Sequence, residues 1–511
     1  MAFNIKALIG AILGFNVLVC LILYRNAETT TSKFLGTQEP FLGFENRIIP
    51  NYYYSEPWKE YLRNSQFHIK YQRIEDNDNY CSEVAEYQEK NPVQLDENNL
   101  PLSSYRVFCS DYLNANLVKD VMRETGQIVL KKHTIETSPE TPLEQLPPNI
   151  NIFFHKSPSW HRKHKIDVHF LCEGQRYNHI EGHQQMVYKD GAARACRDYG
   201  KYYSGRKDCF NPWAFMPETF DLSDREDCLK ITKYLLSDPN PDNVKWIKKK
   251  SRNSHNAKGV TVLTRENSKA LLEEYEYGSK CGTIEDKYIV QRYIQNPLLL
   301  EGKKFDFRVY LLVANTDPLI LLYHDGFLRF SYSEYNGTST EMTSHITNTA
   351  IVKDLMKHQP STKASAMEDQ MWTFERFEDF IVKKMNLTEN WLESYVRPAM
   401  KKNMLHLIRM HIHNFLLHPR TFELFGVDFI FDENLHLWFL EVNRSPAMQA
   451  TTFEKGRIQS KLVKELFELE FALMYNADFD KVLSQTNWEK VYDGRLSGFE
   501  RYQGLLEEHC V

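Results

Sequence analysis

The sequence predicts a mixed α+β protein, with a smaller α/β domain ahead of a larger body of strand hairpins and long helices. Strand-like and helix-like pieces alternate over residues 104–235, for example YRVFCS, LVKDVMRETGQIVLKKH and NINIFFH. Over residues 236–475 long apolar strands (303–332) are followed by helical patterns (391–418). No G-x-G-x-x-G or G-x-x-x-x-G-K-[ST] motif is present, so neither a Rossmann fold nor a P-loop is indicated.

The first element is an apolar run over residues 7–24, which only Asn16 interrupts. This length just suffices to cross a bilayer, so we expect a transmembrane signal-anchor after a short flank (1–6), with a cleaved signal peptide as the alternative. A polar stalk follows over residues 25–103, and residues 476–511 form a C-terminal tail. The prediction is a single-pass membrane protein with its folded body in the cytoplasm; a lumenal orientation stays open.

Composition and cysteine usage narrow the function classes. A net charge of -5 gives no indication of nucleic-acid binding. Of nine cysteines none forms a C-x-x-C pair, so buried thiols are the preferred interpretation and disulfides in a lumenal domain the alternative. In that alternative, the sequons at Asn336 and Asn386 become glycosylation sites. The histidines of 155–170 and 178–183 match no zinc spacing and indicate hydrogen-bonding roles.

Residues 422–446, FELFGVDFIFDENLHLWFLEVNRSP, place acidic and amide side chains inside an apolar segment. Folded as a hairpin with its turn near Asn434, the segment brings Asp428 opposite about Leu440 or Glu441. Side chains alternate between faces along a strand, so Glu441 and Asn443 share a face. Two carboxylates and an amide oxygen suit a hard cation, and we expect Mg²⁺ here.

A second strand supplies positive charge. In GKKFDFRVYLLV the side chains of Lys304, Asp306 and Arg308 alternate with apolar ones, which predicts one charged and one core-facing side. The dipeptide at 325–326 (DG) suggests a tight hairpin turn that returns Arg329 toward this strand. With a lysine in the strand WIKKK and the small loop NAKGV, these cations indicate a site for ATP phosphates.

The ordered set WIKKK, AKGV, YIVQRYI, GKKFDFRVYLLV, DGFLRFS, HITN, FELFGVDFIF and LWFLEVNRSP is similar to the tubulin tyrosine ligase-like family. The resemblance extends from about residue 178, with FMPETF (215–220) as an early landmark, to about residue 465. It implies that the larger body is an ATP-grasp-like core using ATP and Mg²⁺ as cofactors.

Carried over by motif, the resemblance also implies roles for individual residues. The residues that it implies in nucleotide binding are Lys249, Lys258, Gly259, Val260, Gln291, Arg292, Tyr293, Ile294, Lys304 and Asp306. The catalytic residues are Arg308, Arg329 and Glu441. The residues implied in substrate contacts are Arg329, Thr347 and Asn348. The implied metal ligands are Asp428, Glu441 and Asn443.

Two departures from the family pattern stand in the nucleotide region. The lysine at 249 is followed by Lys250 where the family has proline, and the loop reads N-A-K-G-V in place of R-G-x-G-I. These changes keep open a second class of function, a membrane-anchored and catalytically weak ATP-binding protein.

The activity that the resemblance implies is ATP-dependent carboxylate–amine ligation, in which an acyl phosphate is attacked by the amine of a free amino acid. The preferred interpretation is a tubulin polyglutamylase (a tubulin–glutamic acid ligase) that forms isopeptide bonds on glutamate side chains; a tubulin glycylase is the alternative. The expected partners are the acidic C-terminal tails of tubulin or of another protein, free glutamate or glycine, and the membrane through the anchor, but no nucleic acid. Residues 245–252, Lys401 and Lys402 are candidates for tail binding.

Overall fold

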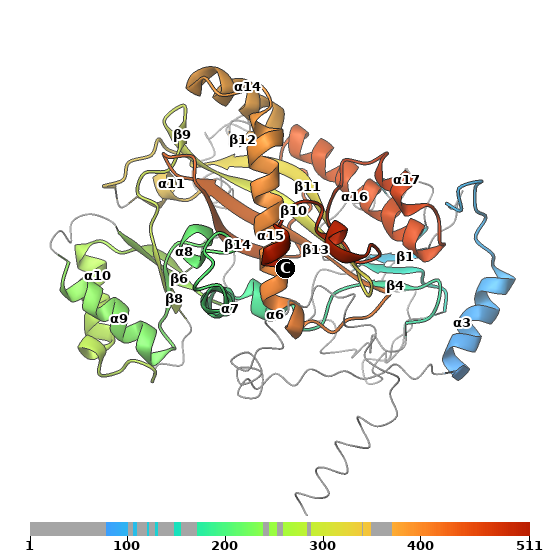
Figure 1. Ribbon diagram of the computed structural model, residues 1–511, viewed down its shortest axis with the longest axis horizontal. Coiled ribbons are helices and arrows are strands. Elements are labelled where there is room, and N and C mark those ends of the chain that lie inside the picture. The colour runs from blue at the N-terminus through green and yellow to red at the C-terminus, as the bar shows by residue number, and fades with distance from the viewer. Residues whose placement is uncertain are drawn as a thin grey trace, which may run out of the picture. The chain divides into compact units, whose positions relative to one another are not determined.

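The fold is mixed α+β, as the sequence predicted (Figure 1). The computed structural model describes residues 78–100, 106–109, 120–121, 128–130, 148–154, 171–238, 245–252, 259–283, 288–339, 341–348 and 370–511. All of them belong to one compact unit, residues 48–511.

The described residues form two sheets. The larger has eleven strands, in the order β12-β11-β10-β13-β4-β3-β1-β2, with β14 on β13, β15 on β11 and β9 on β10. The strands are β1 (Arg106–Cys109), β2 (Ile128–Leu130), β3 (Ile152–Phe154), β4 (Arg176–Asn178), β9 (Leu299–Leu300), β10 (Lys303–Thr316), β11 (Leu319–Phe330), β12 (Met371–Trp372), β13 (Thr421–Phe431), β14 (Leu437–Arg444) and β15 (Glu489–Asp493). Because β4 pairs in parallel with β13, strands from before and after residue 235 share this sheet.

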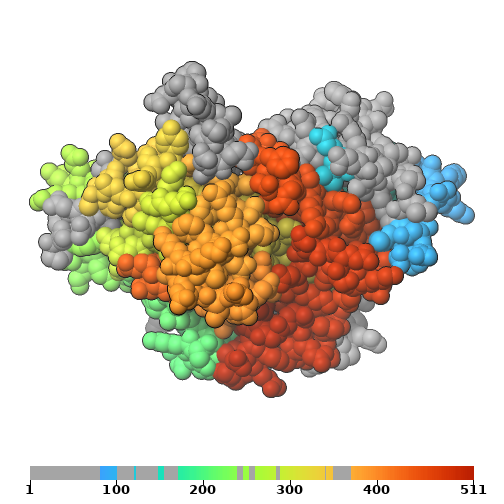
Figure 2. Space-filling view, turned by 90° about the horizontal axis from the view of Figure 1, so that it is seen from above, coloured from blue at the N-terminus to red at the C-terminus, as the bar shows by residue number. Residues whose placement is uncertain are grey.

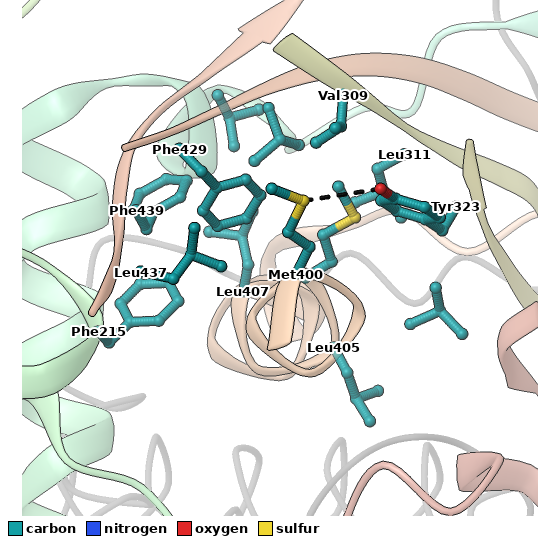
Figure 3. Close-up of a cluster of buried hydrophobic side chains, with 14 of the residues drawn as sticks. Phe215, Val309, Leu311, Tyr323, Met400, Leu405, Leu407, Phe429, Leu437 and Phe439 are labelled. Atoms are coloured by element: carbon teal, nitrogen blue, oxygen red, sulfur yellow. Dashed lines mark hydrogen bonds between the residues drawn. The ribbon is translucent and has the colours of Figure 1, made fainter. Parts of the chain in front are cut away.

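Both faces of this sheet are covered, which explains why its strands are almost continuously apolar. Along β10, Val309 and Leu311 pack in one cluster with α15 (Arg397–His411), whereas Tyr310 and Leu312 pack in another with α16 (Phe453–Met474). Figure 3 shows the α15 side, where Val309, Leu311, Phe429 and Phe439 surround Met400 and Leu407. Each such side chain contributes roughly 1.5–3 kcal/mol when it is fully buried.

The same alternation positions charged side chains on the opposite side of the sheet. Lys304, Asp306 and Arg308 continue the Tyr310 series toward the start of β10, so they lie on the α16 side. On β13, Asp428 follows Phe422 and Leu424 on this side. A candidate site is therefore placed on one face, at one end of the large sheet.

The smaller sheet has four strands in the order β5-β8-β6-β7. They are β5 (Thr219–Asp221), β6 (Trp246–Lys250), β7 (Val260–Val262) and β8 (Tyr288–Arg292). One face packs against α9 (Arg225–Leu236) and α10 (Arg265–Glu274) through Trp246, Val290 and Leu271. Lys249 and Gln291 alternate with these residues, which places their side chains on the other face.

No helix in the described part of the chain is long and apolar enough to cross a membrane. This finding contradicts the sequence-based prediction of a single-pass membrane protein with a cytoplasmic body, which is withdrawn. The apolar run over residues 7–24 and most of the stalk lie outside the described residues.

Disulfides, the less favoured interpretation of the cysteines, link Cys81 to Cys172, Cys209 to Cys510 and Cys228 to Cys281. The C-terminal segment is tied to the fold in two ways: β15 pairs with β11, and Cys510 is bonded to Cys209. Figure 2 shows this segment (red) beside the α14 and α15 region (orange), where α14 is Phe374–Met385. Residues 476–511, expected as a tail, thus contribute a strand to the large sheet.

Candidate active site

Four charged side chains from three adjacent strands form a buried network at the end of the large sheet. Arg329 donates to both oxygens of Asp306 at 2.7 Å and to Asp428 Oδ2 at 2.9 Å. Arg308 donates from Nε to Asp428 Oδ1 at 2.5 Å and from a terminal nitrogen to Oδ2 at 2.9 Å. The network is set by strand register, because Asp306 lies opposite Arg329 and Arg308 opposite Asp428.

The β13–β14 hairpin adds the other two predicted metal ligands. Asp428 is paired with Glu441, and Gly426 with Asn443, in the register expected from the sequence. The Asn443 amide donates to Asp428 Oδ2 at 3.2 Å and to Glu441 Oε1 at 3.3 Å. The three side chains therefore converge, although Asn443 here presents its amide nitrogen to the carboxylates.

The smaller sheet brings more polar groups to this region. Lys249 donates to Gln291 Oε1 at 2.7 Å, and Gln291 in turn donates to Thr219 Oγ1 at 2.9 Å. Lys304 donates to the Tyr293 hydroxyl at 3.1 Å, and its ammonium lies 4.4 Å from the centre of that ring. These contacts position both side chains; Lys304 is buried and Lys249 is half-buried.

Lys189 is a functional candidate that the sequence analysis missed. It is the first residue of α7 (Lys189–Tyr202), and its ammonium lies 2.9 Å from Glu441 Oε2. Buried Asp190 accepts bonds from Ser251 and Arg252, which directly follow β6, so the start of α7 is tied to the smaller sheet. Nothing in its surrounding segment, YKDG, distinguishes Lys189 from a surface lysine.

Lys189, Gln291 and Glu441 also line one small cavity, with residues of α7, β8 and β14 around it. The candidate site is thus built from both sheets and from α7. It contains five basic side chains, those of Lys189, Lys249, Lys304, Arg308 and Arg329, but only three acidic ones. Such a surplus favours an anionic ligand.

Burial and neighbouring charges perturb several ionisable groups here. Burial raises the pKa of the Glu441 carboxyl, but Lys189, Lys249 and Arg308 outweigh it and hold that pKa far below its usual range. Burial lowers the pKa of Lys249 to about 8, against the opposing charge of Glu441. Burial, reinforced by Lys249, lowers the pKa of Lys304 to about 7, and Asp306 opposes that shift. Lys304 can therefore gain a proton near neutral pH when an anion binds beside it.

The lowered pKa of Lys304 predicts a pH dependence of stability. Between about pH 7 and pH 10 the unfolded chain binds a proton on Lys304 that the folded chain does not, so the free energy of unfolding rises with pH in this window. We expect Lys304→Met to lose part of this rise, as measured by denaturant unfolding at about pH 7 and 9.5. Its neighbour provides the control: Lys303→Met should keep the full rise. Equal slopes in all three proteins would contradict the assignment.

Other predicted site residues are placed differently. Arg292 points to the opposite face of β8, where it pairs with Glu218 at 3.1 Å and lies over the Trp246 ring. In a nucleotide site on the Gln291 side of this sheet, Arg292 could therefore contribute only its backbone. Thr347 donates to Asp306 Oδ2 at 2.5 Å, and half-buried Asn348 follows it in the chain. Lys258 lies outside the described residues.

The basic segments proposed for tail binding are largely engaged within the protein. Lys245 pairs with Asp238, Lys248 with Glu274 at 2.9 Å, and Lys401 with Glu489 at 2.8 Å. Because these lysines are paired with acidic side chains, we expect them to attract an acidic peptide less strongly than unpaired lysines would.

The departure at Lys250 has a structural counterpart in the loop between β6 and β7. The Lys250 backbone N–H donates to the Gly259 carbonyl at 2.8 Å and closes the loop between β6 and β7. Proline, the family residue, has no N–H and could not make this bond. Gly259 has a φ of +77°, and a Cβ there would lie 2.9 Å from that of Lys250, so glycine is needed where the two strands meet.

Comparison with known proteins gives a consistent family assignment. The family model described as "Tubulin-tyrosine ligase family" matches residues 167–479. "Protein polyglycylase TTLL10" of Macaca fascicularis is 28% identical over 52% of this chain and 47% of its own length, and "Tubulin glycylase 3A" of Drosophila melanogaster 30% identical over 51% and 25%. "Probable tubulin polyglutamylase ttll-9" of Caenorhabditis elegans is 27% identical over 59% of this chain and 69% of its own. The chain spans less than half the length of each of the two glycylases. The family model nevertheless covers most of the described part of this chain, and the chain belongs to the tubulin-tyrosine ligase family.

Proposed function

We propose that the chain is an ATP- and Mg²⁺-dependent ligase with an ATP-grasp-like core, which joins a free amino acid to side-chain carboxylates of an acidic protein segment. The observation that carries the proposal is the convergence of Asp428, Glu441 and Asn443 with Lys189 and Arg308 on one end of the large sheet. Two carboxylates and an amide are oxygen donors that suit Mg²⁺, and the surrounding cations suit a triphosphate. Bound Mg²⁺ would neutralise phosphate oxygens during transfer.

The residues have separable tasks in this scheme. Lys249 and Lys304 hold phosphate oxygens, and Lys304 gains positive charge when these anions raise its pKa. Arg308 and Arg329 stabilise the negative charge of the acceptor carboxylate and the transferred phosphoryl group. The carboxylate oxygen bonds to the γ-phosphorus as ADP leaves; the amine then bonds to the acyl carbon, phosphate leaves, and the nitrogen gives a proton to solvent.

Glycine is the donor that we favour, with glutamate as the alternative. This preference replaces the glutamylase interpretation because two of the three relatives named above are glycylases. Their names also suggest the acceptors: tubulin in one case, and a protein not further specified in another. An acidic segment, of which a tubulin tail is one example, is therefore the acceptor that we propose.

The donor is tested by incubating the protein with Mg²⁺, ATP, an acidic tail peptide and an equimolar mixture of glycine, glutamate and tyrosine. We expect mass spectrometry to show a ladder spaced by the glycine residue mass and ADP formed in step with it. A peptide with every glutamate and aspartate changed to its amide is the matched control and should gain nothing. A glutamate ladder would establish the alternative, and no ladder with any donor from ATP-binding protein would contradict the proposed ligase.

A further inference from the structure

In the described part of the chain, three disulfides link segments that are far apart in the sequence. Cys81 in α3 (Asp78–Lys90) bonds Cys172 ahead of β4, across 91 residues. Cys228 in α9 bonds Cys281 across 53 residues, and Cys209 bonds Cys510 across 301 residues. Among the cysteines whose side chains are described, only buried Cys196 is a free thiol.

Such pairing is informative in a chain of this size. A fold with a large core does not need disulfides to be stable, unlike a small secreted domain. Cytosolic thiols are kept reduced by glutathione and thioredoxin, so three structural disulfides indicate an oxidising compartment. Five of the six paired cysteines are buried, which protects these bonds once they are formed.

Zinc binding is the alternative to a disulfide for one of these cysteine pairs. Cys209 and Cys510 lie beside Asp208 and His509, and the ligand atoms of the four side chains lie within 4.8 Å of one another. His509 is already 2.7 Å from Asp208, and the two sulfur atoms are bonded to each other. A disulfide flanked by an ion pair accounts for all four groups without a metal.

Two N-x-[ST] sequons lie on exposed turns. Asn336 follows β11, and its Oδ1 accepts bonds from the Thr338 N–H at 3.0 Å and the Thr338 hydroxyl at 2.8 Å. Asn386 is the left-handed C-cap of α14, with a φ of 51°, and Thr388 after it is exposed. A third match, Asn443-Arg444-Ser445, is half-buried, has its amide bonded to Asp428 and Glu441, and precedes Pro446.

We propose that this protein folds in an oxidising compartment, where its three cysteine pairs are closed and Asn336 and Asn386 are modified with N-linked oligosaccharides. Each disulfide forms as two thiols pass two electrons and two protons to a protein disulfide oxidant, which becomes a dithiol. Each glycan is transferred from a lipid pyrophosphate: asparagine Nδ2 bonds to the sugar's anomeric carbon, the carbon–oxygen bond to pyrophosphate breaks, and the amide loses one proton. Asn443 stays unmodified.

A consequence that rests on the proposed function concerns the acceptor. If the ligase works where it folds, its acidic acceptor is a polypeptide that enters the same compartment. The chemistry that recognises this acceptor, a carboxylate-rich segment next to Arg308 and Arg329, is unchanged.

The test uses the full chain purified from eukaryotic cells and reads mass rather than activity, so it is independent of ligation. Treatment with an N-glycan amidase should lower the mass and leave aspartate at positions 336 and 386. Asn336→Gln and Asn386→Gln should each remove the part of this mass decrease that comes from one glycan. The control Asn390→Gln, which changes an exposed asparagine outside any sequon, should leave the decrease unaltered. A mass that is unchanged by the amidase would overturn the glycan assignment.

The disulfides are read on the same sample. Alkylation of the denatured protein without reductant should leave six cysteines unlabelled, and these should become labelled only after reduction. Labelling of all cysteines without reductant, or zinc bound in proportion to protein and lost in Cys209→Ser, would overturn the oxidised state. A ligase that is active but reduced and unglycosylated would refute this inference and leave the proposed function standing.

Discussion

Replacing Glu441 with glutamine is expected to lower the rate of amino acid ligation by about 10²–10³-fold, the range typical for the loss of one preorganised electrostatic contact in an active site. The substitution keeps the shape of the side chain but removes its negative charge. Glu441 now faces Lys189 at 2.9 Å and Asn443 at 3.3 Å, and its strongly lowered pKa shows that the surroundings favour the ionised form. Neutral glutamine would be a poor ligand for Mg²⁺.

The same hairpin provides the matched control. Glu433 lies in the exposed turn between β13 and β14, where its carboxylate accepts a bond from Asn296 at 2.8 Å. Glu433→Gln should keep ligation within about twofold of the parent, because exposed polar substitutions rarely change more than about 0.5 kcal/mol. Ligation should be followed by mass spectrometry over a range of Mg²⁺ concentrations. Unchanged ligation in Glu441→Gln would refute its assignment as a metal ligand.

The arrangement of the three predicted metal ligands was predictable because it depends on local strand rules. Alternation of side chains and a turn near Asn434 placed Asp428 opposite Leu440 or Glu441, and put Asn443 on the same face as Glu441; the structure has Asp428 opposite Glu441. Alternation likewise placed Lys304, Asp306 and Arg308 together. Contacts within one strand or one hairpin need no knowledge of distant sequence.

The hairpin turn predicted at residues 325–326 was wrong. Asp325 and Gly326 lie inside β11, and Arg329 is on the same strand. The turn that leads from β10 into this strand is at Asp317–Pro318. Gly326 is needed in β11 for a different reason: a Cβ would lie 1.9 Å from the carbonyl oxygen of Arg308, at a register shift between the strands. A bulge glycine and a turn glycine look alike in a single sequence.

Long-range contacts were the other features that could not be predicted from the sequence. Lys189 meets Glu441 from 252 positions away in the chain, through a helix that is anchored on Asp190. The pairing of Cys209 with Cys510 spans 301 residues, and cysteine counting alone allows many pairings. Both depend on how two sheets and the C-terminal segment pack, which local patterns do not encode.

Replacing Arg329 with methionine is expected to destabilise the fold by about 3–5 kcal/mol, the usual cost of removing one partner from a buried ion pair. Arg329 is 9% exposed and makes three bonds to Asp306 and Asp428. Burial lowers the pKa of its guanidinium, but the two carboxylates raise that pKa above its usual range. Without Arg329, Asp306 is left with the hydrogen bond from Thr347, and Asp428 still has its ion pair with Arg308. Two buried carboxylates thus lose a compensating positive charge.

Denaturant unfolding of Arg329→Met should show the loss as a lower midpoint with an unchanged dependence on denaturant. Arg292→Met makes the same substitution at an exposed ion pair and should cost no more than about 1 kcal/mol. The double variant Arg329→Met/Asp306→Asn separates charge from packing, because it removes one of the two uncompensated carboxylates. It should be more stable than the sum of the single changes predicts, by about 1–3 kcal/mol. Simple additivity would mean that Arg329 acts through its packing and not through the charges that it neutralises.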